Sequence, residues 1–169
     1  MIPIKYAIIN CMKLYHASPI KNLKVIKPQR TISHDKYIGN FVFATKYKKL
    51  ALMYLLPKGF PTLMNVRSKN PYVVICASVE EILKRDKGGT LYLLPGNLFS
   101  QSPQKELNEY EMVSKEAVVP LSEDDYESVT QKLISENISI YFVDSDTFNK
   151  LILNPKQDSM VKALNKYLP

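Results

Sequence analysis

The sequence predicts an α+β domain, and three observations support this class. Short apolar segments with strand character are interrupted by helical segments of unequal length, without the regular alternation of a doubly wound sheet. Apolar residues make up 46% and charged residues 23% of 169 residues, close to the average of globular proteins. No apolar run reaches the ~18 residues that a membrane helix needs. We expect one domain over residues 1–169, with residues 1–11 as an N-terminal extension.

The first half of the chain predicts two strands and a helix. A strand begins at Lys13 and ends at residues 16–19, because Pro19 disfavours a strand interior. Residues 21–26 alternate weakly, and the polar residues 30–39 predict a loop. The apolar residues 41–44 predict a buried strand. Thr45 is a suitable N-cap for a helix whose apolar positions recur up to Pro57.

The second half predicts strands and helices in an irregular order. The expected strands are 72–79, 90–94, 107–113 (extended or closed by 117–120) and 138–143. The expected helices are a single turn at 80–84, 122–135 with acids in its first turn, 147–153 capped by Asp144 or Ser145, and 158–168 after Pro155.

Charge and cysteine usage restrict the functional classes. The net charge is +7, but only Arg30, Arg67 and Arg85 are arginines, which favours a solvated lysine surface over a dedicated nucleic-acid face. Cys11, Cys76, His16 and His34 lack the spacing of a zinc site, so we expect no metal. The N-terminus lacks the features of a signal peptide. We therefore expect a cytoplasmic protein that contacts no membrane and is a monomer or weak oligomer.

Three segments carry residues suited to chemistry. The first is residues 14–18, in which His16 ends an apolar strand and is followed by Ala17 and Ser18. The second is residues 39–45, which contain Phe43 and lead into a helix with Ala51 and Tyr54. The third is residues 108–114, where a strand would place the carboxylates of Glu109 and Glu111 on one face. Each segment alone also has an ordinary structural explanation, as core or as a solvated strand face.

Taken in this order, the three segments resemble the ADP-ribosyltransferase superfamily of the diphtheria-toxin and poly(ADP-ribose) polymerase type. His16-Ala17-Ser18 matches its His-Gly-Ser or His-Gly-Thr motif, Val42-Phe43-Ala44-Thr45 with Ala51 and Tyr54 matches its Tyr-Phe-Ala segment and helix, and Asn108-Glu109-Tyr110 matches its Asn-Glu-Tyr strand. The resemblance covers roughly residues 13 to 143. It implies two small, mostly antiparallel sheets forming a split β core with flanking helices.

The resemblance also implies a reaction and a set of residues. The substrate would be NAD, whose nicotinamide–ribose bond breaks through an oxocarbenium-like ribose, and the ADP-ribose acceptor would be an unknown protein or nucleic acid. Glu109 or Glu111 would stabilise the developing positive charge. His16 would hydrogen-bond a hydroxyl of the adenosine-side ribose, and Ala17 and Ser18 would hold the carboxamide. Phe43 and Tyr54 would line the nicotinamide site, and Arg30 would pair with the pyrophosphate.

Two departures from the family pattern leave alternatives open. Ala17 stands where the family has Gly, and Val42 stands where the family has Tyr. The first aromatic wall of the nicotinamide pocket is therefore missing unless Tyr47 replaces it. The second alternative is therefore a catalytically inactive module of the same fold that binds ADP-ribose or another nucleotide. The third is an RNA-binding protein, including the 2′-phosphotransferase branch of the fold, although that branch relies on several arginines.

Overall fold

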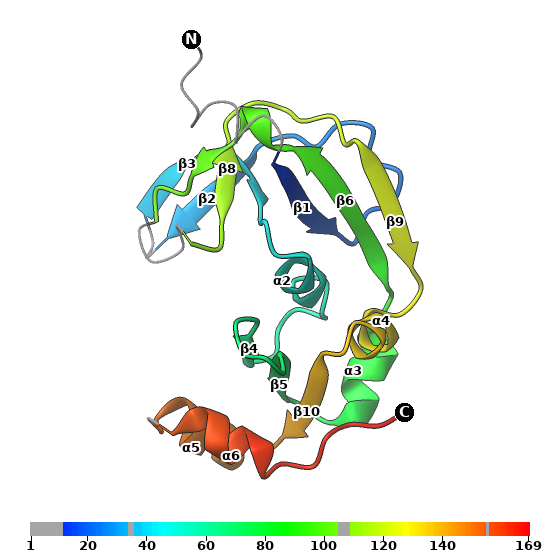
Figure 1. Ribbon diagram of the computed structural model, residues 1–169, viewed down its shortest axis with the longest axis vertical. Coiled ribbons are helices and arrows are strands. Elements are labelled where there is room, and N and C mark those ends of the chain that lie inside the picture. The colour runs from blue at the N-terminus through cyan, green and yellow to red at the C-terminus, as the bar shows by residue number, and fades with distance from the viewer. Residues whose placement is uncertain (1–11, 34–35, 105–108, 155) are drawn as a thin grey trace. The chain divides into compact units, whose positions relative to one another are not determined.

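A computed structural model describes residues 12–33, 36–104, 109–154 and 156–169 (Figure 1). These residues contain helices and several antiparallel sheets, so the predicted α+β class is confirmed. The chain divides into two compact units, residues 1–51 with 89–125 and residues 52–88 with 126–169.

The secondary structure consists of short elements. The strands are β1 (Lys13–Ser18), β2 (Gln29–Ser33), β3 (Lys36–Ala44), β4 (Thr62–Asn65), β5 (Tyr72–Cys76), β6 (Gly89–Pro95), β7 (Ser100–Gln101), β8 (Met112–Ser114), β9 (Ser122–Tyr126) and β10 (Ser139–Val143). The helices are α2 (Lys48–Met53), α3 (Val79–Arg85), the 3₁₀ helix η1 (Gly96–Leu98), α4 (Val129–Ser135), α5 (Ser145–Ile152) and α6 (Gln157–Lys162).

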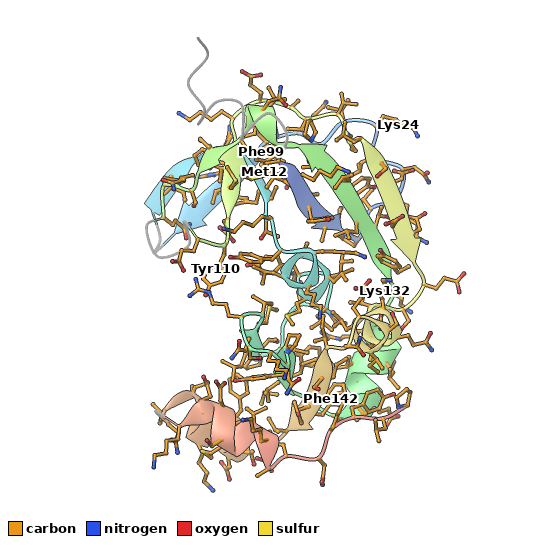
Figure 2. The ribbon with its side chains drawn as sticks, in the orientation of Figure 1. Met12, Lys24, Phe99, Tyr110, Lys132 and Phe142 are labelled. Carbon is orange, nitrogen blue, oxygen red and sulfur yellow. The ribbon has the colours of Figure 1, made fainter. Side chains whose placement is uncertain are left out.

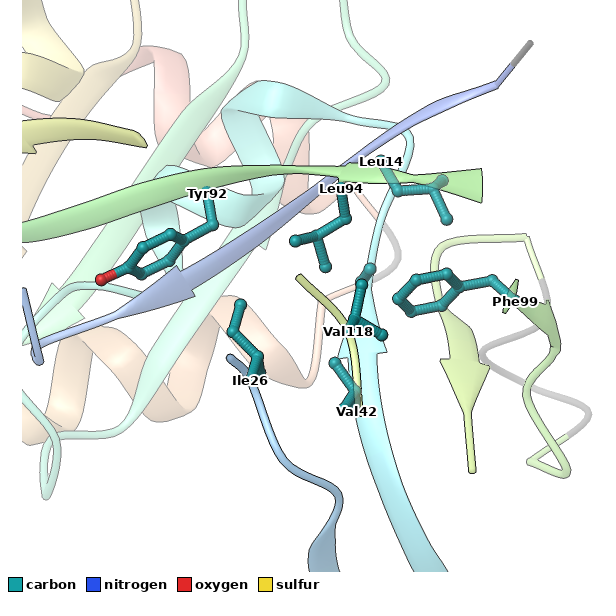
Figure 3. Packing of buried hydrophobic residues seen from close by; sticks show 8 residues of the cluster. Leu14, Ile26, Val42, Tyr92, Leu94, Phe99 and Val118 are labelled. Atoms are coloured by element: carbon teal, nitrogen blue, oxygen red, sulfur yellow. The ribbon is translucent and has the colours of Figure 1, made fainter. Parts of the chain in front are cut away.

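The first unit is built from two sheets, with strand orders β1-β6-β9 and β2-β3-β8-β7. A bridge between Tyr15 and Thr45 connects β1 to the end of β3, with reciprocal backbone hydrogen bonds of 2.7 and 2.9 Å. Between the sheets lies a core that includes Leu14, Val42 and Tyr92, all at most 1% exposed (Figure 3). Burial of these apolar side chains holds the two sheets together.

The second unit is a mixed sheet of order β10-β5-β4, in which β10 runs parallel and β4 antiparallel to β5. Tyr72 and Val74 of β5 pack with Phe148, Leu151 and Val161 of α5 and α6. Val73 and Ile75 alternate with them and are also buried. Both faces of β5 are therefore covered, which explains its continuous apolar sequence.

Asp86 joins two helices of the second unit. It follows α3, and its carboxylate accepts hydrogen bonds from the Ser128 hydroxyl at 2.8 Å and from the Val129 and Thr130 amides at 2.9 Å each, at the start of α4. Partial burial alone would raise the pKa of Asp86, but these hydrogen bonds outweigh burial and leave the pKa below its usual value.

Several sequence predictions are confirmed with small shifts of their ends. Strands occupy the predicted positions at residues 13–18, 41–44, 72–76, 90–94 and 139–143, and α3, α5 and α6 occupy three predicted helical segments. Asp144 is the cap of α5, because its side chain accepts the Thr147 amide at 2.7 Å. The prediction of Thr45 as the N-cap of a helix up to Pro57 is wrong. α2 begins three residues after Thr45 and ends at Met53, and the Thr45 hydroxyl accepts the Tyr47 amide at 3.1 Å in the turn before the helix.

The helix predicted over 122–135 is wrong in its first half. Residues Ser122–Tyr126 form β9, and the helix begins only at Val129 with Ser128 as its cap. Acids in a first helical turn contribute only a few tenths of a kcal/mol each. Pairing with β6 satisfies the backbone, and the Thr90 hydroxyl donates to Asp125 at 2.5 Å. An acidic edge strand also resists association with other edges.

The loop predicted at residues 30–39 is also wrong. β2 and β3 pair there as an antiparallel ladder with a register shift between Thr31 and Ile32. Polar composition does not prevent strand formation in an exposed ladder. Gly39 has φ 142°, and a Cβ at this position would lie 2.5 Å from the Phe41 ring, so a glycine is needed.

Two segments near the ends of the chain also differ. The final helix ends at Lys162 instead of Leu168, and the Tyr167 amide donates to the Ile140 carbonyl of β10 at 2.8 Å. Residues 1–11, His34, Asn108 and Pro155, which were named from the sequence, lie outside the described residues.

We predict that Asp86→Asn lowers the free energy of unfolding by about 1 to 3 kcal/mol, because an amide accepts fewer of the hydrogen bonds at the start of α4. Since the folded-state pKa is lowered, this stabilisation is complete above pH about 4 and disappears as the pH falls through the folded-state pKa. Urea denaturation of the variant and of wild type at several pH values measures it.

Asp124→Asn, at an exposed position of β9, is the matched control and should have little effect. Equal stability of Asp86→Asn and wild type at neutral pH would contradict the proposed role of Asp86.

Candidate functional site

His16 is fixed by a hydrogen bond between the first two motifs. Its Nδ1 lies 2.7 Å from the carbonyl oxygen of Phe43, in β3. A carbonyl can only accept, so Nδ1 carries the proton and Nε2 of the neutral ring carries a lone pair. The ring also lies beside buried Tyr92, with 6.3 Å between centroids. His16 is therefore a fixed hydrogen-bond acceptor.

The environment of His16 keeps the imidazole neutral. Burial lowers the pKa of His16 below 6.5, and this effect outweighs the hydrogen bond to Phe43, which acts in the opposite direction. The protonated form is thus disfavoured at neutral pH. Any ligand group that His16 binds through Nε2 at pH 7 must therefore be a donor, such as a hydroxyl.

Tyr92 orders the loop that follows β1. Its hydroxyl donates to the Ile20 carbonyl at 2.7 Å and accepts the Leu23 amide at 3.1 Å. The Ser18 hydroxyl accepts the Ile20 amide at 3.1 Å. A single buried phenol thus holds a loop that would otherwise have few backbone partners.

A cavity of about 670 Å³ lies between this loop and β3. Its volume is within the range of about 300 to 1,000 Å³ that small-molecule sites occupy. Four of the sequence-predicted residues line it together: His16, Ala17, Ser18 and Phe43. The remaining lining is mainly apolar, with Lys27 and Gln29 as polar exceptions. The cavity can hold a flat apolar group next to a hydrogen-bond acceptor.

The second motif contributes Phe43 and the core residue Val42. Phe43 packs edge-on against Phe41, with 6.1 Å between ring centroids. Val42 is 1% exposed and belongs to the core of the first unit. Tyr47, the suggested replacement for the family's missing tyrosine, packs 6.1 Å from the ring of Tyr110, which Figure 2 labels, and beneath the Lys46 ammonium at 5.1 Å.

The prediction that Glu109 and Glu111 share one strand face is wrong. Glu109 lies in a turn and Glu111 immediately precedes β8, so neither is in a strand where side chains two apart point the same way. The segment is nevertheless close to the second motif, because Met112 pairs with Ala44 and Val113 with Phe43. The acids thus lie just before the strand that pairs with the motif.

Arg30 and Tyr54 do not line this cavity. Arg30 is exposed on β2 and pairs with Asn40. Tyr54 belongs to the second compact unit, where it is 37% exposed and the Lys58 ammonium lies 5.9 Å from its ring centroid.

Tyr92 and the loop 19–23 were missed by the sequence analysis. A tyrosine within the apolar run 90–94 was the available signal, because a buried phenol needs a hydrogen-bond partner. Its partners lie about 70 residues away, so their identity could not be read from the sequence.

Comparison of the chain with protein-family models, curated proteins and solved structures finds no match in any of the three. Among the described residues, no group of three or more His, Cys, Asp or Glu side chains could hold a metal ion. No helix in the described part of the chain has the length and apolar character needed to cross a membrane.

We predict that nitrogen-detected NMR finds His16 neutral at pH 7, with the proton on Nδ1 and a pKa below 6.5. Because this folded-state pKa is lowered, its contribution to stability is complete above pH about 6.5 and is lost on acidification. The His34→Gln variant removes the other imidazole and leaves a single signal set. A proton on Nε2 at neutral pH would contradict the geometry, as would a pKa above 6.5.

Proposed function

We propose that this protein is an NAD-binding ADP-ribosyltransferase-like enzyme with the fold of that superfamily. The observation that carries the proposal is the hydrogen bond from His16 to Phe43, which places the first two motifs at the rim of one cavity. The third motif supports it, because β8 pairs with the strand that bears Phe43.

The residues at the cavity suit two parts of NAD, the adenosine-side ribose and the nicotinamide. The Nε2 lone pair of His16 would accept a hydrogen bond from a hydroxyl of that ribose. The backbone at Ala17 and the hydroxyl of Ser18 would hold the carboxamide, and Phe43 and Phe41 provide an apolar wall for the ring. Because these groups are fixed by the core, substrate orientation costs little further entropy.

The proposed reaction breaks the bond between the ribose C1′ and the nicotinamide nitrogen. The bonding electron pair leaves with nicotinamide, the ribose becomes oxocarbenium-like, and an acceptor nucleophile bonds to C1′ and loses a proton. A carboxylate near C1′ stabilises the positive charge only as it develops, which lowers the barrier. The acceptor is a protein or a nucleic acid of unknown identity.

We infer that Glu111 supplies this carboxylate, with Glu109 as the competing residue. Glu111 is one residue from the pair Met112–Ala44, next to the Phe43 pair, whereas Glu109 lies two residues further into the turn. Arg30, which belongs to the same compact unit as the cavity, remains a candidate for the pyrophosphate.

One observation favours the second alternative, a module that binds NAD or ADP-ribose without turnover. Val42 is buried in the core where the family places an aromatic wall. Fewer contacts to the nicotinamide ring would position it less well. The rate of NAD turnover would then fall more than the affinity for NAD.

We predict that nicotinamide release from NAD, followed chromatographically with cell extract as the acceptor source, falls at least about 100-fold in Glu111→Gln, because the amide cannot neutralise the ribose charge. Glu109→Gln should have a smaller effect. Glu116→Gln, an exposed acid of the same segment, is the matched control and should be unaffected.

If Glu109→Gln loses activity and Glu111→Gln does not, the assignment of the two acids is reversed. Calorimetric NAD binding without nicotinamide release would support the non-catalytic module instead. If the protein neither binds NAD nor releases nicotinamide from it, the proposal is refuted.

A further inference from the structure

The second compact unit contains a cavity of its own, of about 530 Å³. It lies where the loop between β4 and β5, the end of α4, strand β10 and helix α6 meet. Every residue that lines it belongs to residues 52–88 or 126–169, so its geometry does not depend on the first unit.

Positive charge dominates this cavity. Lys69, Lys162 and Lys166 line it together with one acid, Asp158. The carboxylate of Asp158 already accepts the Tyr72 hydroxyl at 2.6 Å and the Asn65 amide at 3.1 Å. None of the three lysines forms an ion pair with a carboxylate of the described residues. The lysines are therefore available to an anionic ligand.

The backbone that carries these lysines is anchored. The Asn65 side chain accepts the amides of Arg67 and Ser68 at 3.1 and 3.2 Å, which orders the loop before Lys69. On the other side, Tyr167 is held to β10 by its amide, which donates to the Ile140 carbonyl, and by a ring contact with Phe142 at 5.2 Å between centroids. Phe142 is labelled in Figure 2. These contacts position the neighbouring Lys166. Anchored backbone lets several lysines face one ligand group at reduced entropic cost.

The other lining residues suit a flat heterocycle. Tyr72 and Tyr141 meet edge-to-face with 6.4 Å between centroids, and Ile134 and Val161 extend the apolar wall. Asn70 and Asn137 bring amide groups that can both donate and accept. Aromatic walls, amide groups and cationic point charges together are the features that bind a base and its phosphate.

We propose that this second cavity binds a nucleoside phosphate, either as a free nucleotide or as a residue of single-stranded RNA. The lysines pair with the phosphate, and the tyrosine wall with the asparagine amides receives the base. The site is separate from the His16 cavity, so the proposal stands whether or not the chain cleaves NAD.

The test is calorimetric titration of the full chain with uridine monophosphate, whose base is absent from NAD. Uridine and inorganic phosphate are the half-ligand controls, and an oligouridylate is the RNA arm. We expect the monophosphate to bind more tightly than either half. Lys162→Ala/Lys166→Ala should weaken binding about tenfold or more, and so should added salt, because charge pairing with the phosphate is lost or screened.

Two variants keep the outcome interpretable. Lys84→Ala/Lys87→Ala removes the same charge from exposed positions outside the cavity, and His16→Ala alters the first cavity; both should bind normally. Tighter binding of the oligomer than of the nucleotide identifies RNA as the source, and equal affinity identifies the free nucleotide. Equal binding of phosphate and monophosphate, or unchanged binding in the cavity lysine variant, would overturn the proposal.

Discussion

The candidate site of the first unit depends on one hydrogen bond, from Nδ1 of His16 to the carbonyl oxygen of Phe43 at 2.7 Å. It joins two segments 27 residues apart, fixes the tautomer of the ring and leaves a single lone pair at Nε2. Burial lowers the pKa of His16 and so preserves that state at neutral pH. The Tyr92 hydroxyl orders the loop after β1 on the other side of the cavity. The shape of the cavity thus depends on two polar side chains, His16 and Tyr92, whose hydrogen bonds are satisfied.

Apolar periodicity predicted the buried strands because burial is what stabilises them. The run 72–76 is covered on both faces and was found from sequence alone. The exposed strands β2 and β9 were missed for the opposite reason. Their residues are mostly polar, and their strand form comes from pairing with β3 and β6. A single sequence does not reveal which segments pair, even where the partner follows directly, as β3 follows β2.

The same distinction applies to the candidate sites. His16, Ala17, Ser18 and Phe43 could be named because a short motif carries each of them, and they line one cavity. The alternation argument for Glu109 and Glu111 failed because it presumed a strand that begins only at Met112. The lysine cavity had no local signal at all. Lys69 and Lys166 are nearly a hundred residues apart, and only the packing of α6 and the C-terminal segment on β5 and β10 brings them together.

The most direct test of the central claim is a titration of the His34→Gln protein with NAD, observed through the His16 ring nitrogens. We predict saturable binding that shifts the Nε2 resonance as it accepts a hydrogen bond from a hydroxyl, with the Nδ1 proton retained. Acidification below the pKa of His16 should abolish binding, because the protonated ring has no lone pair to offer. Saturable NAD binding that leaves Nε2 unshifted, or persists with a protonated ring, would contradict the account.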